Sequence, residues 1–159
     1  MTVRQSEASA VEERIAADLV GHQLQDLEWR EHDLLFSFTT GARLRVACPW
    51  RIVSDGRISF AKSDDGQFFG LPAPIDGAAK SKELLLGKAI EQIAIRADAA
   101  DLTITFRSAV SLEIWNNSSG YEGWELHDAR GFHVVAMGGG QLAIWGLDHK
   151  DKNADATGD

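Results

Sequence analysis

The sequence contains a single cysteine, Cys48, and only three prolines among 159 residues. One cysteine cannot form an intramolecular disulfide or a thiol-based zinc site, so the composition indicates a reducing compartment. A catalytic thiol needs a nearby histidine and an electropositive setting, and the sequence around Cys48 reveals neither. We therefore interpret Cys48 as a small buried hydrophobic residue.

Basic residues are also scarce, because 16 Lys and Arg stand against 24 Asp and Glu and give a net charge of −8. This balance disfavours nucleic acid and anionic membranes as partners, since both are bound by clustered basic side chains. A basic protein partner is compatible with it. The sequence has no apolar run as long as a membrane helix, and residues 1–10 lack the apolar core of a signal peptide, so we expect a cytoplasmic protein.

One pattern occurs twice in the chain. Two apolar residues and a glycine, followed by alternating apolar positions, occupy residues 19–46 and again residues 85–114. Gly87 follows Gly21 by 66 residues, and Asp101 follows Asp33 by 68. This near-constant offset predicts an internally duplicated unit. The C-terminal segment from residue 121 has no evident counterpart in the first half.

The local patterns predict helices and antiparallel strands. Ser9 and Glu12 have the spacing of a capping box before a helix over residues 10–20, and residues 78–86 occupy the same place before Gly87. Period-two alternation predicts strands with one buried and one solvated face at residues 34–38, 44–48, 102–107 and 110–114. Short apolar runs at residues 58–61 and 68–71 lie beside Asp-Gly turns and are expected to be hairpin-like.

These elements predict an α+β fold that is predominantly antiparallel β. Two pseudo-duplicated helix-plus-meander repeats, at about residues 10–48 and 78–115, would be closed by C-terminal hairpins at residues 121–146 into a sandwich or a partly open barrel. The single domain would cover residues 9–147. Residues 1–8 are expected to form a disordered N-terminus and residues 148–159 a disordered tail.

The C-terminal segment carries a specific pattern. In one-letter form it is Y-E-x-W-E, a glycine turn, an apolar strand, and G-G-x-apolar-x-apolar-W, represented here by residues 121–125, Gly131 and residues 139–145. This pattern resembles the C-terminal end of a family of small bacterial proteins of unknown function, and the resemblance extends over most of residues 19–145. It implies a fold and domain boundaries but no activity.

Candidate binding residues cluster in and before this segment. Trp115 should lie with Glu113 on the outer face of its strand, where it would be either an exposed contact residue beside Tyr121 or covered by another element. Alternation along an extended strand would place Glu122 with Trp124 and leave Glu125 on the opposite face. The five candidates are Trp115, Tyr121, Glu122, Trp124 and Glu125.

The expected position of Glu122 leaves its role open. A carboxylate beside Trp124 and Leu126 would be partly buried and must be paired, hydrogen-bonded or protonated. Such a group can fix a loop, bind a ligand or act as a general acid. Glu125 would project toward solvent or a partner.

Three functions remain open from the sequence. The preferred one is a non-enzymatic protein-binding module that uses Trp115 and Tyr121. The alternatives are an acidic immunity-type inhibitor of a basic toxin, and a small hydrolase or lyase that uses Glu122 with His127 or His133 as weak catalytic candidates. A homodimer stays open as well.

The sequence predicts no cofactor and no metal site. Its five histidines show no i, i+4 spacing and no second thiol accompanies them. His127 and His133 flank one turn, so they can approach each other across a hairpin, and a pair on the surface is the default interpretation.

Overall fold

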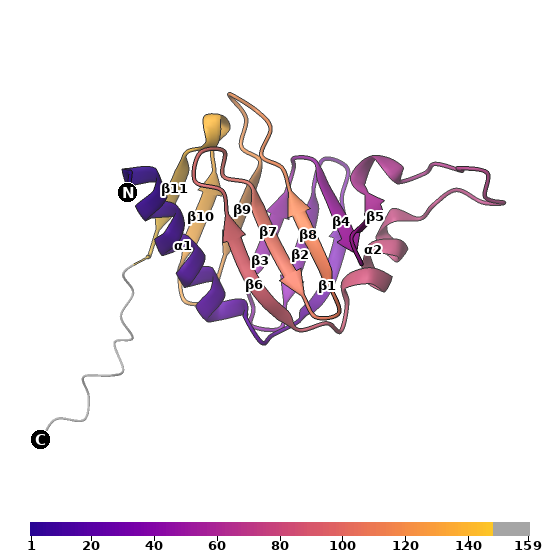
Figure 1. Ribbon diagram of the computed structural model, residues 1–159, viewed down its shortest axis with the longest axis horizontal. Helices are drawn as coiled ribbons and strands as arrows, with labels where there is room; N and C mark the ends of the chain where they lie inside the picture. Colours follow the sequence, from indigo (N-terminus) through magenta and orange to yellow (C-terminus); the bar gives the residue numbers. More distant parts are fainter. Residues whose placement is uncertain (148–159) are drawn as a thin grey trace, which may run out of the picture.

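The computed structural model describes residues 1–147, and the tail at residues 148–159 lies outside the described residues. Two antiparallel sheets face each other in a sandwich (Figure 1). The six-stranded sheet consists, in spatial order, of β1 (Leu24–Trp29), β2 (Leu34–Phe38), β3 (Arg43–Val46), β9 (Trp124–His127), β10 (His133–Ala136) and β11 (Leu142–Trp145). The five-stranded sheet consists of β5 (Arg57–Ala61), β4 (Trp50–Ser54), β8 (Val110–Ile114), β7 (Leu102–Phe106) and β6 (Ile90–Ile95). The predicted α+β, predominantly antiparallel class is confirmed.

The two halves of the chain build equivalent three-stranded units. The order β1-β2-β3 in one sheet matches β6-β7-β8 in the other, and a bulge follows Leu24 in β1 and Ile90 in β6. The strand that follows each unit belongs to the opposite sheet: β4 follows β3 but pairs with β8, and β9 follows β8 but pairs with β3. The strands β9 and β10 of the second half therefore take the place that β4 and β5 take in the first.

This arrangement corrects the view that the C-terminal segment has no counterpart. Trp50 opens β4 opposite Ile114, and Trp124 opens β9 opposite Val46, so the two tryptophans are structurally equivalent. Three residues connect β3 to β4, whereas nine connect β8 to β9. The longer second connection hides the equivalence in the sequence.

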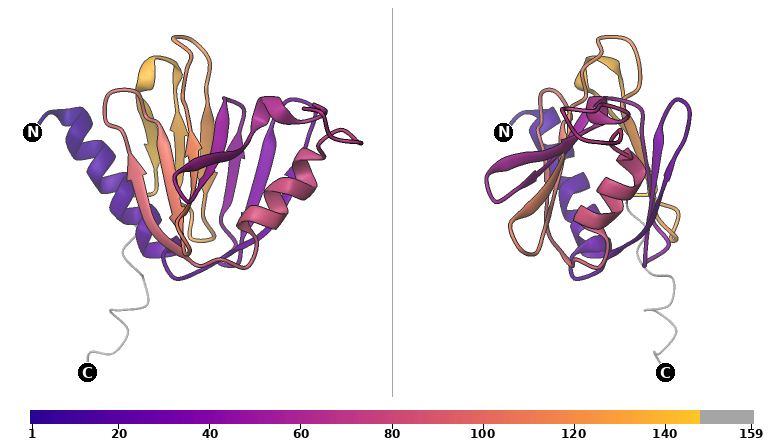
Figure 2. Two further views of the ribbon diagram at one scale, coloured as in Figure 1. Left: turned by 45° about the vertical axis from the view of Figure 1, so that its right-hand side comes forward. Right: turned by 90° about the vertical axis from the view of Figure 1, so that its right-hand side faces the viewer.

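The two helices fill the open sides between the sheets (Figure 2). Helix α1 (Val3–Leu19) packs against β6, and α2 (Gly77–Leu85) packs against β1 and β5. The apolar stripe of α1, with Val11, Ile15 and Leu19, is buried as its spacing predicts. Within residues 1–147, neither helix has the length and apolar character needed to cross a bilayer.

The start of α1 differs from the prediction. The capping box is formed by Thr2 and Gln5 rather than by Ser9 and Glu12, so residues 1–8 are not a disordered N-terminus. Nothing between Val3 and Ala10 disfavours a helix, and the cap at Thr2 satisfies the free amides at its end. The Glu12 carboxylate instead accepts a hydrogen bond from the backbone of Ile95 at 2.9 Å and ties α1 to β6.

Trp124 belongs to the core and is not a contact residue. Its side chain is fully buried, and its indole Nε1 donates a hydrogen bond to the carbonyl oxygen of Ala100 at 2.7 Å. The alternation of β9 places Trp124 and Leu126 between the sheets, where both are shielded from any partner. The prediction of Trp124 as a binding residue is therefore wrong.

Candidate functional site

An exposed apolar loop projects from the end of the sandwich. It connects the short helix η1 (Lys62–Asp64) to α2 and extends beyond the sheets (Figure 1). We call residues 66–75 the finger. Three large side chains near its tip are mostly exposed: Phe68 at 56%, Phe69 at 67% and Leu71 at 52%. The run at residues 68–71 is therefore a solvent-facing turn and not a strand that contributes to the core.

Hydrogen bonds at both ends give the finger a defined shape. At its base, Gly66 N donates to Ile75 O at 2.8 Å, and Ile75 N donates to Gln67 O at 2.9 Å. At its tip, Leu71 N donates to Phe68 O at 2.7 Å. The residues between them, Phe69 and Gly70, have φ values of 46° and 78°. Positive φ at both central positions indicates a type I′ turn.

Phe69 is an unfavourable residue for this turn. Glycine adopts positive φ without steric conflict, whereas a side chain with a Cβ pays roughly 1 to 2 kcal/mol in the left-handed region. Asn and Asp are the residues that tolerate this conformation best after glycine. The tip therefore places an aromatic side chain in solvent at a conformational cost, which is a common property of functional turns.

Three carboxylates hold the base of the finger. Asp64 accepts from the backbone of Ala61 at 2.9 Å, Asp65 accepts from Gly77 at 2.8 Å, and Asp76 caps α2 by accepting from Ala79 at 3.1 Å. No basic residue occurs between Lys62 and Lys80 in the sequence. The finger therefore has an apolar tip and an acidic base, and the carboxylates of the base are hydrogen-bonded to the backbone.

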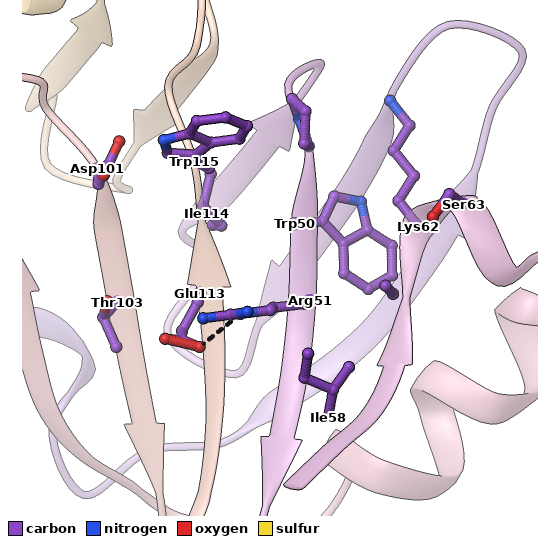
Figure 3. A pocket seen from close by; sticks show the side chains of 12 residues that line it. Trp50, Arg51, Ile58, Lys62, Ser63, Asp101, Thr103, Glu113, Ile114 and Trp115 are labelled. Atoms are coloured by element: carbon purple, nitrogen blue, oxygen red, sulfur yellow. Dashed lines mark hydrogen bonds and ion pairs between the residues drawn. The ribbon is translucent and has the colours of Figure 1, made fainter.

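A pocket of about 790 Å³ opens on the five-stranded sheet beside the base of the finger. Trp115, Ile58 and Pro49 contribute apolar walls, and an ion pair between Arg51 and Glu113 at 3.0 Å crosses from β4 to β8 (Figure 3). Lys62 and Ser63, the first two residues of η1, also line the pocket, so it is continuous with the segment that leads into the finger. The other lining residues are Trp50, Ala61, Asp101, Thr103 and Ile114.

Trp115 lies where the alternation predicts, on the outer face with Glu113, and is 60% exposed. Among residues 1–147, no helix or strand covers it. Tyr121 is 82% exposed, but it does not line the pocket. Its backbone N–H donates to Ser118 Oγ at 2.9 Å, which orders the loop between β8 and β9.

The two glutamates of the C-terminal pattern have exchanged their expected roles. The Glu122 side chain is 49% exposed, and its Oε2 forms a long ion pair with Arg45 Nη2 at 4.0 Å. The Glu125 side chain is 23% exposed and accepts from Arg45 Nε at 2.8 Å. The alternation fails because β9 begins only at Trp124, and because Gly123 and Trp124 are buried in succession.

Glu125 lies in a network of charged groups on the outer face of the six-stranded sheet. Burial acts to raise the pKa of Glu125, but hydrogen bonds from Arg45 and His133 outweigh it and hold this pKa below its usual 4.5. The hydrogen bond from Arg30 is the main cause that lowers the pKa of the neighbouring Asp33, which also accepts from Arg45. These carboxylates are ionised and paired at neutral pH.

His127 and His133 do approach each other across their hairpin. Their rings stack with centroids 3.6 Å apart, and Trp145 stacks on the other side of His133 at 4.8 Å. Among the hydrogen bonds and ion pairs of residues 1–147, none joins Glu122 to either histidine. The pairing required for a hydrolase or lyase based on Glu122 is therefore not formed.

Cys48 is confirmed as a buried residue. It is 5% exposed, and burial raises the pKa of its thiol to about 11. A thiol with this pKa is almost entirely protonated at neutral pH, which excludes the activated form that a nucleophilic cysteine needs.

Sequence reasoning missed the finger as a site. Two features of the sequence indicate an exposed turn here. Phe68 and Phe69 are adjacent and so do not alternate as strand residues do, and Pro72 and Pro74, two of the three prolines of the chain, follow them closely. Proline donates no backbone hydrogen bond and disfavours a central strand. Such a segment is poorly suited to the core despite its apolar composition.

A comparison with protein families finds a match over residues 15–146 to a model described as a family of unknown function, DUF6188. The matched range includes the finger, the pocket and the histidine pair. No curated protein and no solved structure matches the chain. The match confirms the resemblance to a family of unknown function that the C-terminal pattern suggests.

Proposed function

The chain belongs to DUF6188, a family of unknown function, and we propose that it acts as a non-enzymatic protein-binding module. Its contact surface consists of the finger and the adjoining pocket. The observation that carries the proposal is the group of three exposed apolar side chains held at the tip of a hydrogen-bonded turn.

The apolar tip supplies the binding energy in this proposal. Full burial of a Phe or Leu side chain contributes about 1.5 to 3 kcal/mol. Because Phe68, Phe69 and Leu71 are each more than half exposed, a partner that covers them gains about half of that for each side chain. The turn is already formed in the free protein, so little conformational entropy is lost on binding.

The acidic base defines the chemistry of the partner. Asp64, Asp65 and Asp76 lie at the base of the finger, and the whole chain carries a net charge of −8. A partner with an apolar cleft and a rim of Lys and Arg would match both features. Charge complementarity of this kind accelerates association and selects against acidic partners.

The pocket extends the contact surface. Its volume of about 790 Å³ can receive side chains of a partner, and Trp115 provides the type of large aromatic anchor that dominates binding energy in many interfaces. A partner that encloses the finger would reach the pocket along Lys62 and Ser63, which line the pocket and lead into the finger. Tyr121 is exposed on the loop that follows Trp115 and is a candidate for the edge of the same contact.

An inhibitor of a basic toxin is the second candidate function. The acidic base of the finger favours it, because a basic toxin would offer the required Lys and Arg. In this case the gene beside the one for this chain should encode a basic protein whose activity the purified chain abolishes. Replacement of Phe68 by Ser should then restore the toxin's activity.

Site-specific photocrosslinking in the cells that produce the protein tests the proposal. We expect p-benzoylphenylalanine at position 68 or 115 to give a discrete crosslinked product with one protein. The same probe at Trp145 is the matched control, because Trp145 is 53% exposed but belongs to the other sheet. Identical products at all three positions, or no product at positions 68 and 115, would contradict the proposal.

A further inference from the structure

We propose that Glu125, His127 and His133 form a binding site for one divalent ion of the zinc class. The site lies on the outer face of the six-stranded sheet and is separate from the finger and the pocket. One potential ligand atom from each residue lies within 4.8 Å of the other two. Oε2 of Glu125 is 3.2 Å from Nε2 of His133 and 3.8 Å from Nε2 of His127.

Strand geometry, rather than loop conformation, brings the three side chains together. Glu125 and His127 are two residues apart on β9, so they share one face of the sheet. His133 is paired directly with His127 across the antiparallel ladder of β9 and β10. The backbone positions of all three ligands are therefore fixed before a metal binds.

Small side-chain rotations complete the site. Zinc bonds to histidine nitrogen and carboxylate oxygen are about 2.0 to 2.2 Å long, which separates the ligand atoms of a tetrahedral site by about 3.3 Å. The Glu125–His133 distance of 3.2 Å already meets this value. The His127 side chain is 55% exposed, so it can leave its stacked position and turn Nε2 toward the ion without disturbing the core.

Neighbouring groups orient the ligands. Arg45 donates to Oε1 of Glu125, which leaves Oε2 directed at the two histidines. Trp145 stacks on His133 and restricts rotation of its ring. Partners of this kind, which hold a metal ligand in position, commonly contribute a factor of about 10 to 100 to metal affinity.

The local charge also permits a cation. Arg30 and Arg45 supply two positive charges, while Asp33, Glu122 and Glu125 supply three negative charges. Arg43, which is paired with His127 across β3 and β9, adds a third positive charge, so the cluster with neutral histidines has a net charge of zero and does not repel an ion. Two imidazoles and one carboxylate suit Zn²⁺, Co²⁺ and Ni²⁺ better than Mg²⁺ or Ca²⁺, which prefer oxygen ligands.

The sequence predicts no metal site because its histidines lack a ligand spacing along the chain, but the pairing of β9 with β10 brings two of them together. The histidines are six residues apart along the chain, which matches no helical ligand spacing, but the β9–β10 pairing sets them side by side. Three protein ligands leave a coordination position of zinc open to solvent. A water molecule or an anionic group of another molecule can occupy it.

Titration of the full chain with Zn²⁺ by calorimetry at pH 7.5 tests the site. We expect one saturable equivalent, and we expect His127→Ala and His133→Ala each to weaken the affinity at least tenfold. The matched controls His22→Ala, His32→Ala and His149→Ala change the other three histidines and should leave the affinity unchanged. Co²⁺ should give the visible absorption of a four- or five-coordinate ion, and this absorption should be absent in His127→Ala.

Two results would overturn the site. One is the absence of saturable Zn²⁺ binding to the wild-type chain. The other is equal affinity in the wild type and in His127→Ala. Because His127 is half-exposed, its replacement leaves the fold intact, and a circular dichroism melt of the variant checks this.

Discussion

Replacement of Phe69 by Asn should stabilise the protein relative to the same replacement at Phe68. Phe69 has a φ of 46°, whereas Phe68 is not among the residues with positive φ. A bulky side chain in the left-handed region costs roughly 1 to 2 kcal/mol, and Asn tolerates this region. Both variants lose one mostly exposed aromatic side chain, so the comparison isolates the backbone strain.

The expected difference follows from these terms. Phe68 is 56% exposed and Phe69 is 67% exposed, so Phe68→Asn removes slightly more buried apolar surface than Phe69→Asn. This difference of about a tenth of a side chain costs Phe68→Asn roughly 0.2 to 0.3 kcal/mol more, and it adds to the effect of the strain. The free energy of unfolding of Phe69→Asn should therefore exceed that of Phe68→Asn by about 1 to 2 kcal/mol. In thermal melts of a domain of this size, each 1 kcal/mol of this difference corresponds to about 2 to 4 °C.

Urea denaturation followed by tryptophan fluorescence measures this difference. Equal midpoints, or a lower midpoint for Phe69→Asn, would refute the claim that the tip of the finger is strained. If the reasoning holds, Phe69→Asn is more stable than Phe68→Asn, and both variants bind the partner less well than the wild type. A residue that supports binding at a cost in backbone strain is typical of a functional site.

Three further predictions concern the carboxylate network and the thiol. Glu125→Gln should lower the free energy of unfolding by about 1.5 kcal/mol, because it removes charge-assisted hydrogen bonds in a partly buried site. Glu122→Gln should lower it by less than about 0.5 kcal/mol, because that side chain is half-exposed. Urea melts that rank the two variants in the opposite order would support the expectation that Glu122, and not Glu125, is the buried carboxylate. The folded-state pKa values of Asp33 and Glu125 are lowered from 3.8 and 4.5, so their stabilisation is complete above those unfolded-state values and is lost as pH falls through the folded-state values. Urea midpoints should accordingly decrease as the pH is lowered below about 5, and less steeply in Glu125→Gln; equal slopes would show that Glu125 is not the source. Cys48, with its pKa raised to about 11, should resist a thiol-specific chromogenic disulfide at pH 8 in the native protein and react fully in denaturant, and rapid native labelling would contradict its burial.

The sheets could be predicted from the sequence because their signals are local. Period-two alternation in residues such as Leu34, Phe36 and Phe38 reports directly which side chains face the core. The same signal placed Trp115 correctly on the outer face. The similarity of the two halves was visible for the same reason, since alternation and the preceding glycine are both short-range patterns.

The candidate site depended on information that is not local. Glu122 was assigned to a strand that begins two residues later, so its face could not be inferred from alternation. The contact of His127 with His133 and the hydrogen bond from Arg45 to Glu125 arise from pairing between strands, which the sequence does not state. Burial of the finger residues was also undetermined, because an apolar run signals the core only if another element covers it.

The affinity of the crosslinked partner for finger variants tests the central claim most directly. Once the partner is purified, calorimetric titration should show that Phe68→Ser and Phe69→Ser each weaken binding about 4- to 12-fold, which is the loss of roughly 0.75 to 1.5 kcal/mol expected when a half-exposed side chain no longer contacts the partner. Val3→Ser, which changes an exposed apolar residue at the start of α1, should bind the partner as tightly as the wild type. Wild-type affinity in both finger variants would contradict the account.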